Sequence, residues 1–211
     1  MAPSSSMSAA VQLLDDDEMI LRRTGVRFPI ELRPAAFRAD HLESWPVVEG
    51  RLEYVEGKLL FMPPCGETQQ EVASDVVFIL RSWSEKQRDF VVGTNEAGMK
   101  LGPDIRAADA AVWRRADVGS IGTGLRHVPP VLAIEVAGQD EEETVLREKA
   151  RWYLDHGVAI VWLVLPDTRE VVVCTGSGES RHVMGTRLAD DLRIPELGPD
   201  VDRFFVQIDR R

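Results

Sequence analysis

The stretch 129–166, PPVLAIEVAGQDEEETVLREKARWYLDHGVAIVWLVLP, constrains the fold most strongly, because two apolar runs enclose a segment with helical spacing. The runs 131–134 and 158–165 are short and contain no charged residue, which is typical of strands buried on both faces. Apolar residues recur at intervals of three and four over 141–156, and Gly157 follows as a helix-ending residue. A strand, a helix and a parallel strand form the right-handed crossover unit of an α/β core.

Two charged residues interrupt this unit where burial is expected. Glu135 directly follows the first apolar run, and a lone buried carboxylate is unfavourable unless it is paired or binds a cation. Lys149 lies on the predicted helix, four residues before Tyr153, among residues that should face the sheet. The lysine is therefore the expected partner, and a purely structural buried ion pair is the alternative reading.

Two more carboxylates are predicted on strands. Asp109 begins the run DAAVW at 109–113, although a turn residue at a strand end is the alternative for this aspartate. Glu53 lies in RLEYVEGKLLFM at 51–62, which predicts a hairpin around the EG dipeptide. A solvated hairpin glutamate is the alternative for Glu53.

Together, the acids Glu53, Asp109 and Glu135 and the base Lys149 predict a hard-oxygen site. Carboxylates converging on one point suit Mg²⁺ or Mn²⁺, which keep waters and substrate phosphate in the rest of their coordination shell. A nearby lysine can orient or deprotonate water and can stabilise the charge that develops on phosphorus. This combination is the chemistry of phosphodiester hydrolysis.

These motifs resemble a known family in order and spacing. The chain is similar to the Uma2 family of predicted endonucleases, a bacterial branch of the PD-(D/E)xK restriction-endonuclease-like fold, from about residue 35 to about residue 206. The residues that carry the resemblance are Asp109 before a hydrophobic strand, IEV at 134–136, EK at 148–149 with Tyr153, Gly157-Val158 and Trp162, LEYVEGKL at 52–59 and MPP at 62–64.

The resemblance implies a mixed β-sheet flanked by helices, and a metal-dependent endonuclease acting on DNA. It implies that Asp109 and Glu135 bind the metal and that Lys149 is the catalytic lysine. This lysine is displaced from its usual place, two residues after the glutamate, onto the following helix. Glu53 becomes a further acid of the site, and a homodimer is expected because restriction nucleases often pair to cut two strands.

Three positions depart from the usual residues of that family. Ala108 stands where proline usually precedes the aspartate, Gly138 replaces a serine, and Gln69 occupies the place of a histidine. These departures favour, as the alternative function, a catalytically inactive nuclease-fold module that binds nucleic acid or protein. A metal-dependent hydrolase of another phosphate ester is a second alternative.

Composition limits the possible partners and cellular location of the protein. The net charge of −10 argues against a broad basic surface for phosphate, although it leaves room for a local basic cleft. Two cysteines give no disulfide framework, and no apolar run is long enough to span a membrane, so we expect a cytoplasmic protein. The small, acidic segment 1–25 is expected to be a disordered tail before one domain at 26–211.

The remaining expectations concern single segments. We expect helices at 34–45 and 67–87, strands at 90–92, 99–101, 171–175 and 181–184, and extended chain at 192–205. GSIGTG at 119–124 is expected to be a surface loop, and the acidic run 140–143 a solvated face or cap. Trp152, Tyr153 and Trp162 are expected in the core, and Arg106, Arg114 and Arg115 either meet phosphate or cover a strand edge.

Overall fold

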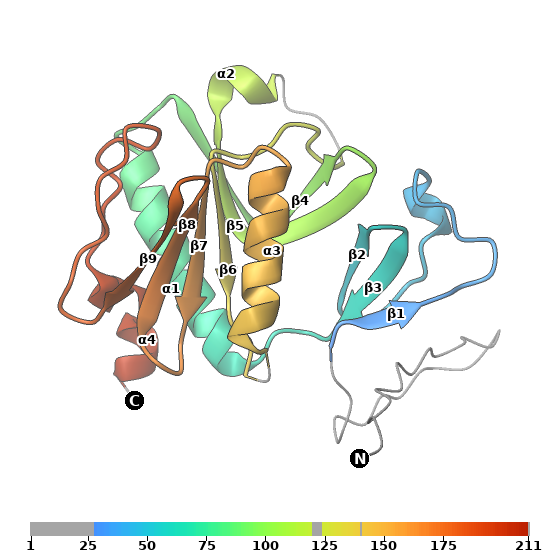
Figure 1. Ribbon diagram of the computed structural model, residues 1–211, viewed down its shortest axis with the longest axis horizontal. Helices are drawn as coiled ribbons and strands as arrows, with labels where there is room; N and C mark the ends of the chain where they lie inside the picture. Colours follow the sequence, from blue (N-terminus) through green and yellow to red (C-terminus); the bar gives the residue numbers. More distant parts are fainter. Residues whose placement is uncertain (1–27, 120–123, 140, 211) are drawn as a thin grey trace, which may run out of the picture. The chain divides into compact units, whose positions relative to one another are not determined.

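The computed structural model describes residues 28–119, 124–139 and 141–210 and divides into two compact units (Figure 1). Unit 1 ends at Pro64, and unit 2 begins at Cys65. The predicted disordered tail, 1–25, and residues 120–123 of the predicted surface loop lie outside the described residues. Helices in the described parts of the chain are all too short or too polar to cross a membrane.

Unit 1 is built on the predicted hairpin. Strands β2 (Arg51–Val55) and β3 (Lys58–Met62) pair antiparallel, and β1 (Ile30–Leu32) adds to the other side of β3. Glu56 and Gly57 adopt φ angles of 51° and 80°, as a two-residue hairpin turn with two left-handed positions requires. The hairpin expected from the EG dipeptide is confirmed.

The helix expected at 34–45 is wrong. Only a single 3₁₀ turn forms, η1 (Leu42–Ser44), and Ala36 has a φ of 61°, which an α-helix excludes. The Ser44 hydroxyl also competes for backbone groups, donating to the carbonyls of Arg38 and His41. Phe37 lies against Trp45 and Tyr54, so aromatic packing decides the path of this segment.

Unit 2 contains a mixed sheet with the strand order β4-β5-β6-β7-β8-β9. The strands are β4 (Phe90–Leu101), β5 (Asp104–Arg114), β6 (Leu132–Val136), β7 (Ile160–Leu165), β8 (Glu170–Thr175) and β9 (Gly178–Val183). Neighbouring strands pair antiparallel except β6 and β7, which are parallel. The predicted strand–helix–strand crossover is therefore confirmed, with α3 (Glu143–Asp155) between its two strands.

Helices cover both faces of this sheet. In Figure 1 α3 crosses the near face in orange, whereas α1 (Glu67–Ser84) lies behind the sheet. The core on the α1 side also contains the short C-terminal helices η2 (Val201–Phe204) and α4 (Val206–Asp209), through Phe204, Phe205 and Ile208. The remaining helix, α2 (Arg115–Val118), is a single turn after β5.

Three strand boundaries and one coil prediction need correction. The strands expected at 90–92 and 99–101 are one strand, β4, whose register shifts between Thr94 and Ala97. Gly93 within it is required by close packing, because a Cβ there would lie 2.7 Å from the Trp113 ring. Asp109, expected at a strand start, lies in the middle of β5. The segment expected to be extended to residue 205 contains η2.

Candidate active site

Glu135 is held on the inner strand β6 with 1% of its surface exposed. Alternation along β6 directs Leu132, Ile134 and Val136 into the core under α1, so Glu135 points to the opposite face, under α3. There the Tyr153 hydroxyl donates to Glu135 Oε1 at 2.7 Å. Tyr153 is buried as predicted, and its hydroxyl group also orients the carboxylate.

Lys149 meets this carboxylate, as the sequence predicts. Its ammonium Nζ lies 3.4 Å from Glu135 Oε2 and 2.7 Å from Glu141 Oε1, and the lysine side chain is only 6% exposed. Leu146, Ala150 and Tyr153 are buried on the same side of α3, which fixes the rotation of the helix. The lysine is therefore oriented between two carboxylates in a water-poor environment.

Asp109 reaches the same strand end from β5. The backbone N–H of Val136 donates to Asp109 Oδ2 at 2.7 Å, one residue beyond Glu135. The register shift in β4 between Thr94 and Ala97 lies opposite Asp109, since Thr94 pairs with Ala110 and Ala97 with Ala108. Bulges of this kind re-aim the facing residue. The structure thus brings Asp109, Glu135 and Lys149 together within unit 2.

Glu53 belongs to unit 1. It lies on β2 with 1% of its surface exposed, which rules out the solvated-glutamate reading. Arg51 Nε lies 3.8 Å from Glu53 Oε1. Participation of Glu53 in a site with the unit 2 residues stays a prediction.

The donor set of unit 2 is compatible with Mg²⁺ or Mn²⁺. Two carboxylates, Asp109 and Glu135, are held on neighbouring strands at one strand end, and Mg²⁺ is commonly bound through one or two carboxylates with waters and substrate phosphate. Within the described ranges no group of three or more His, Cys, Asp or Glu side chains is arranged to hold a metal. The residues present therefore fit a cation that shares its shell with water or phosphate.

The arginines considered for phosphate binding make protein contacts. Arg114 donates to the carbonyl of Arg193, and Arg115 donates to the carbonyls of Arg88 and Phe90. Arg106 is buried with its guanidinium 5.1 Å from the Trp152 ring centre. These contacts favour a structural role near the ends of β5, but the expected surface strand edge is wrong, because β5 pairs with β4 on one side and β6 on the other.

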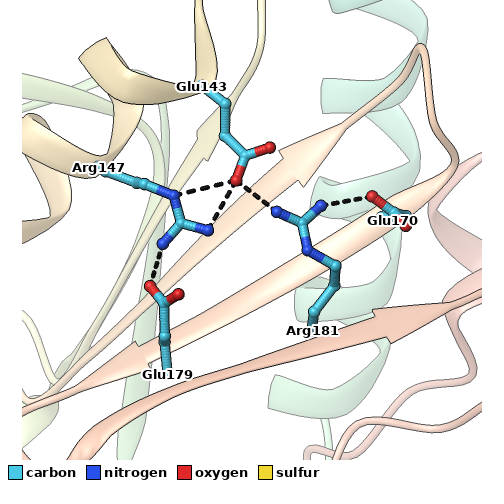
Figure 2. A network of polar contacts seen from close by, with 5 residues as sticks. All are labelled: Glu143, Arg147, Glu170, Glu179 and Arg181. Carbon is cyan, nitrogen blue, oxygen red and sulfur yellow. Dashed lines mark hydrogen bonds and ion pairs between the residues drawn. The ribbon is translucent and has the colours of Figure 1, made fainter.

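A second set of charges joins α3 to strands β8 and β9. Figure 2 shows Glu143 Oε1 accepting hydrogen bonds from Arg147 and from Arg181 on β9. Arg147 also contacts Glu179, and Arg181 contacts Glu170. Burial raises the pKa of Glu143, but the hydrogen bonds from the two arginines outweigh it, so this pKa lies below its ordinary value of 4.5. We call these five residues the α3–β9 network.

Sequence reasoning missed Glu141 as a site residue. The acidic run at 140–143 predicted solvated faces or caps, whereas Glu141 is the nearer partner of Lys149 and Glu143 joins the α3–β9 network. Asp140 lies outside the described residues. The spacing of eight residues between Glu141 and Lys149 gives no helical or strand signal, because Glu141 lies outside α3, two residues before its first residue, Glu143.

Comparisons with known proteins agree with this architecture. A family model, Uma2, described as "Putative restriction endonuclease", matches residues 39–202, most of the chain. The chain is also similar to the crystal structure of "a putative nuclease belonging to DUF820" from Anabaena variabilis, with 21% identity and a TM-score of 0.70. That match covers 81% of this chain and 98% of the other. It confirms the predicted restriction-endonuclease-like fold, whereas no curated protein sequence matches the chain.

Proposed function

Since this chain belongs to the Uma2 family of restriction-endonuclease-like proteins, we propose that it is a metal-dependent endonuclease that hydrolyses phosphodiester bonds in DNA. The observation that carries the proposal is the meeting of Asp109, Glu135 and Lys149 at one end of β6. A buried ion pair gives little stability compared with apolar side chains of the same volume. Function is therefore the better explanation for charge at this position.

In this proposal Asp109 and Glu135 hold Mg²⁺ or Mn²⁺. Such a cation supplies Lewis-acid chemistry, because it polarises the scissile phosphate and lowers the pKa of water. Tyr153 orients Glu135 by donating to Oε1, which leaves Oε2 on the side of Lys149. The Val136 N–H fixes Asp109 in the same way through Oδ2.

Lys149 serves as the catalytic lysine in this proposal. Its ammonium group is placed to orient the attacking water and to stabilise the negative charge that develops on the phosphate oxygens. Glu141 holds the ammonium from the other side, 2.7 Å away, and keeps the flexible lysine chain in one position. The water oxygen then bonds to phosphorus and loses a proton to solvent, while the bond from phosphorus to the leaving sugar oxygen breaks and that oxygen takes up a proton from solvent.

Plasmid and labelled single-stranded DNA cleavage with Mg²⁺ or Mn²⁺ tests the proposal. We expect chelation to abolish cleavage and both Glu135→Gln and Lys149→Met to lower kcat by about 100-fold or more. Glu135→Gln keeps the shape of the side chain and an oxygen for the Tyr153 hydroxyl. Glu179→Gln, which removes a carboxylate from the α3–β9 network, is the matched control and should cleave like wild type.

Other outcomes point to other functions. A wild-type protein that cleaves nothing and shows no Glu135-dependent Mn²⁺ binding by calorimetry would overturn the enzyme proposal. Salt-sensitive DNA binding without cleavage would then identify a binding module. Turnover of small phosphodiesters but not DNA would identify a hydrolase of another phosphate ester.

We also propose a cellular location and an oligomeric state for the enzyme. We place the enzyme in the cytoplasm, where the thiols of Cys65 and Cys174 would stay reduced. A homodimer would let two sites cut both strands of a duplex. Light scattering of the protein with and without DNA measures its oligomeric state.

A further inference from the structure

Val136, the residue after Glu135, has both of its backbone groups bound by side chains from other elements. Its N–H donates to Asp109 Oδ2 at 2.7 Å, and its carbonyl accepts from Gln69 Nε2 at 3.0 Å. The acceptor comes from β5 and the donor from α1. Two consecutive peptide planes are thereby fixed at the point where Asp109 and Glu135 meet.

Backbone pairing with β7 reaches this point, since Val136 pairs with Val164, whereas the contact with β5 is continued by a side chain. The register between β5 and β6 runs from Val112↔Leu132 to Ala110↔Ile134, so the bond from Val136 to Asp109 continues the contact through a side chain. On its other side, β6 is followed by the Ala137 N–H bonded to the Val164 carbonyl of β7. The side-chain bonds from Asp109 and Gln69 thus add to the pairing with β7 in holding the end of β6.

Gln69 is itself well anchored. It lies in the first turn of α1, and Val72 and Val76 of the next turns are buried in the core under β6. Its Oε1 atom faces Gly138, since a Cβ on that glycine would lie 3.4 Å from it. The amide therefore spans the turn that leaves β6, from Val136 to Gly138.

The Val136 carbonyl requires a hydrogen-bond donor at this contact. A carboxylate at position 69 would place an acceptor against the Val136 carbonyl, and a hydrocarbon would leave that carbonyl without this bond. Glutamine supplies the donor without adding charge next to Asp109, Glu135 and Glu141. Partners beyond the metal ligands orient those ligands and change metal affinity or activity when they are lost.

We propose that Gln69 is a positioning residue of the candidate active site, which holds Asp109 and Glu135 in register by fixing the Val136 peptide groups. The proposal rests on the proposed nuclease function for its catalytic consequence. Its structural part is that the bond from Gln69 to the Val136 carbonyl also stabilises the neighbouring bond from the Val136 N–H to Asp109, and this part stands without that function.

Gln69→Met removes the donor and keeps the length of the side chain, and the neighbouring residue offers a matched control. Gln70 Nε2 donates to the Cys65 carbonyl at 2.8 Å, so Gln70→Met loses the same kind of bond one residue along α1. We expect Gln69→Met to speed hydrogen exchange of the Val136 amide by about fivefold. We also expect it to weaken Mn²⁺ binding by about 10-fold, and to lower kcat for DNA with little change in KM. Gln70→Met should change none of these.

Equal behaviour of the two variants in Val136 exchange and in Mn²⁺ affinity would overturn the positioning role. Gln69→Met could destabilise the whole protein, so that all amides exchange faster. In that case Gln69→Glu tests the positioning role, because its carboxylate cannot donate to the Val136 carbonyl. That side chain has the same size, and wild-type exchange at Val136 would then overturn the role. A wild-type protein that fails to cleave DNA overturns the nuclease proposal, while the exchange comparison still decides the role of Gln69.

Discussion

Arg147 and Lys149 lie two residues apart on α3, yet their ion pairs occupy opposite environments. Lys149 faces the sheet, 6% exposed, against Glu135, which is 1% exposed. Arg147 is 31% exposed and contacts β9 in the α3–β9 network shown in Figure 2. Exposed pairs contribute little stability, whereas breaking a buried pair leaves an uncompensated charge. The same helix thus carries two kinds of charge. Glu143 and Arg147 bind it to the sheet, whereas Lys149 belongs to the proposed site.

The largest expected effect comes from breaking the inner pair. Lys149→Met should lower the free energy of unfolding by about 3 kcal/mol or more, because Glu135 stays buried without the ammonium group. Urea unfolding measures the loss. Adding Glu135→Gln to Lys149→Met should recover part of it by removing the stranded charge. A single variant as stable as wild type would show that the two inner charges are not coupled.

An intermediate effect is expected from the hydroxyl that orients Glu135. Tyr153→Phe removes a buried hydrogen bond to a charged acceptor and should lower the free energy of unfolding by about 2 kcal/mol. Tyr54, the second of the two tyrosines, is half-buried in unit 1 and provides the control variant Tyr54→Phe. Equal losses in the two variants, measured by thermal unfolding, would contradict a special role for the Tyr153 hydroxyl.

The smallest effect is expected in the α3–β9 network. A double-mutant cycle of Glu143→Gln and Arg181→Met should give a coupling energy below about 1 kcal/mol that shrinks in high salt. Because the pKa of Glu143 is lowered on folding, its stabilisation is present above the ordinary value of 4.5. It is lost as the pH falls through the lowered pKa. A coupling that persists in acid and in salt would erase the contrast between the two faces.

The central crossover and its charges were predictable because local signals agree there. Apolar runs and helical spacing specified β6, α3 and β7, and Gly157, with a φ of 90°, ends α3 as expected. Glu135 and Lys149 were marked by charge in segments that had to be buried. Their contact follows from the packing of α3 on β6 and needed no further information.

Other features depend on contacts that local patterns do not encode. Glu141 meets Lys149 only because the turn after β6 folds back over the helix start. The two halves of β4 were predicted separately because Gly93 and the polar residues after it are typical of turns, whereas Trp113 on β5 selects the glycine. The helix expected at 34–45 does not form, because aromatic packing around Phe37 outweighs the local helical pattern. Each of these features depends on a contact between different segments of the chain.

The place of Lys149 on α3 also affects how this protein tolerates insertions and deletions. Were acid and lysine on one strand, two residues apart, the pleat alone would keep them on the same face. Here they lie 14 residues apart, and the turn between β6 and α3 sets their meeting. If one residue were removed from that turn and the helix axis stayed in place, each later side chain would be rotated about that axis by about 100°. Chain length between residues 136 and 143 is therefore a constraint on evolution, even where the identity of the residues is not.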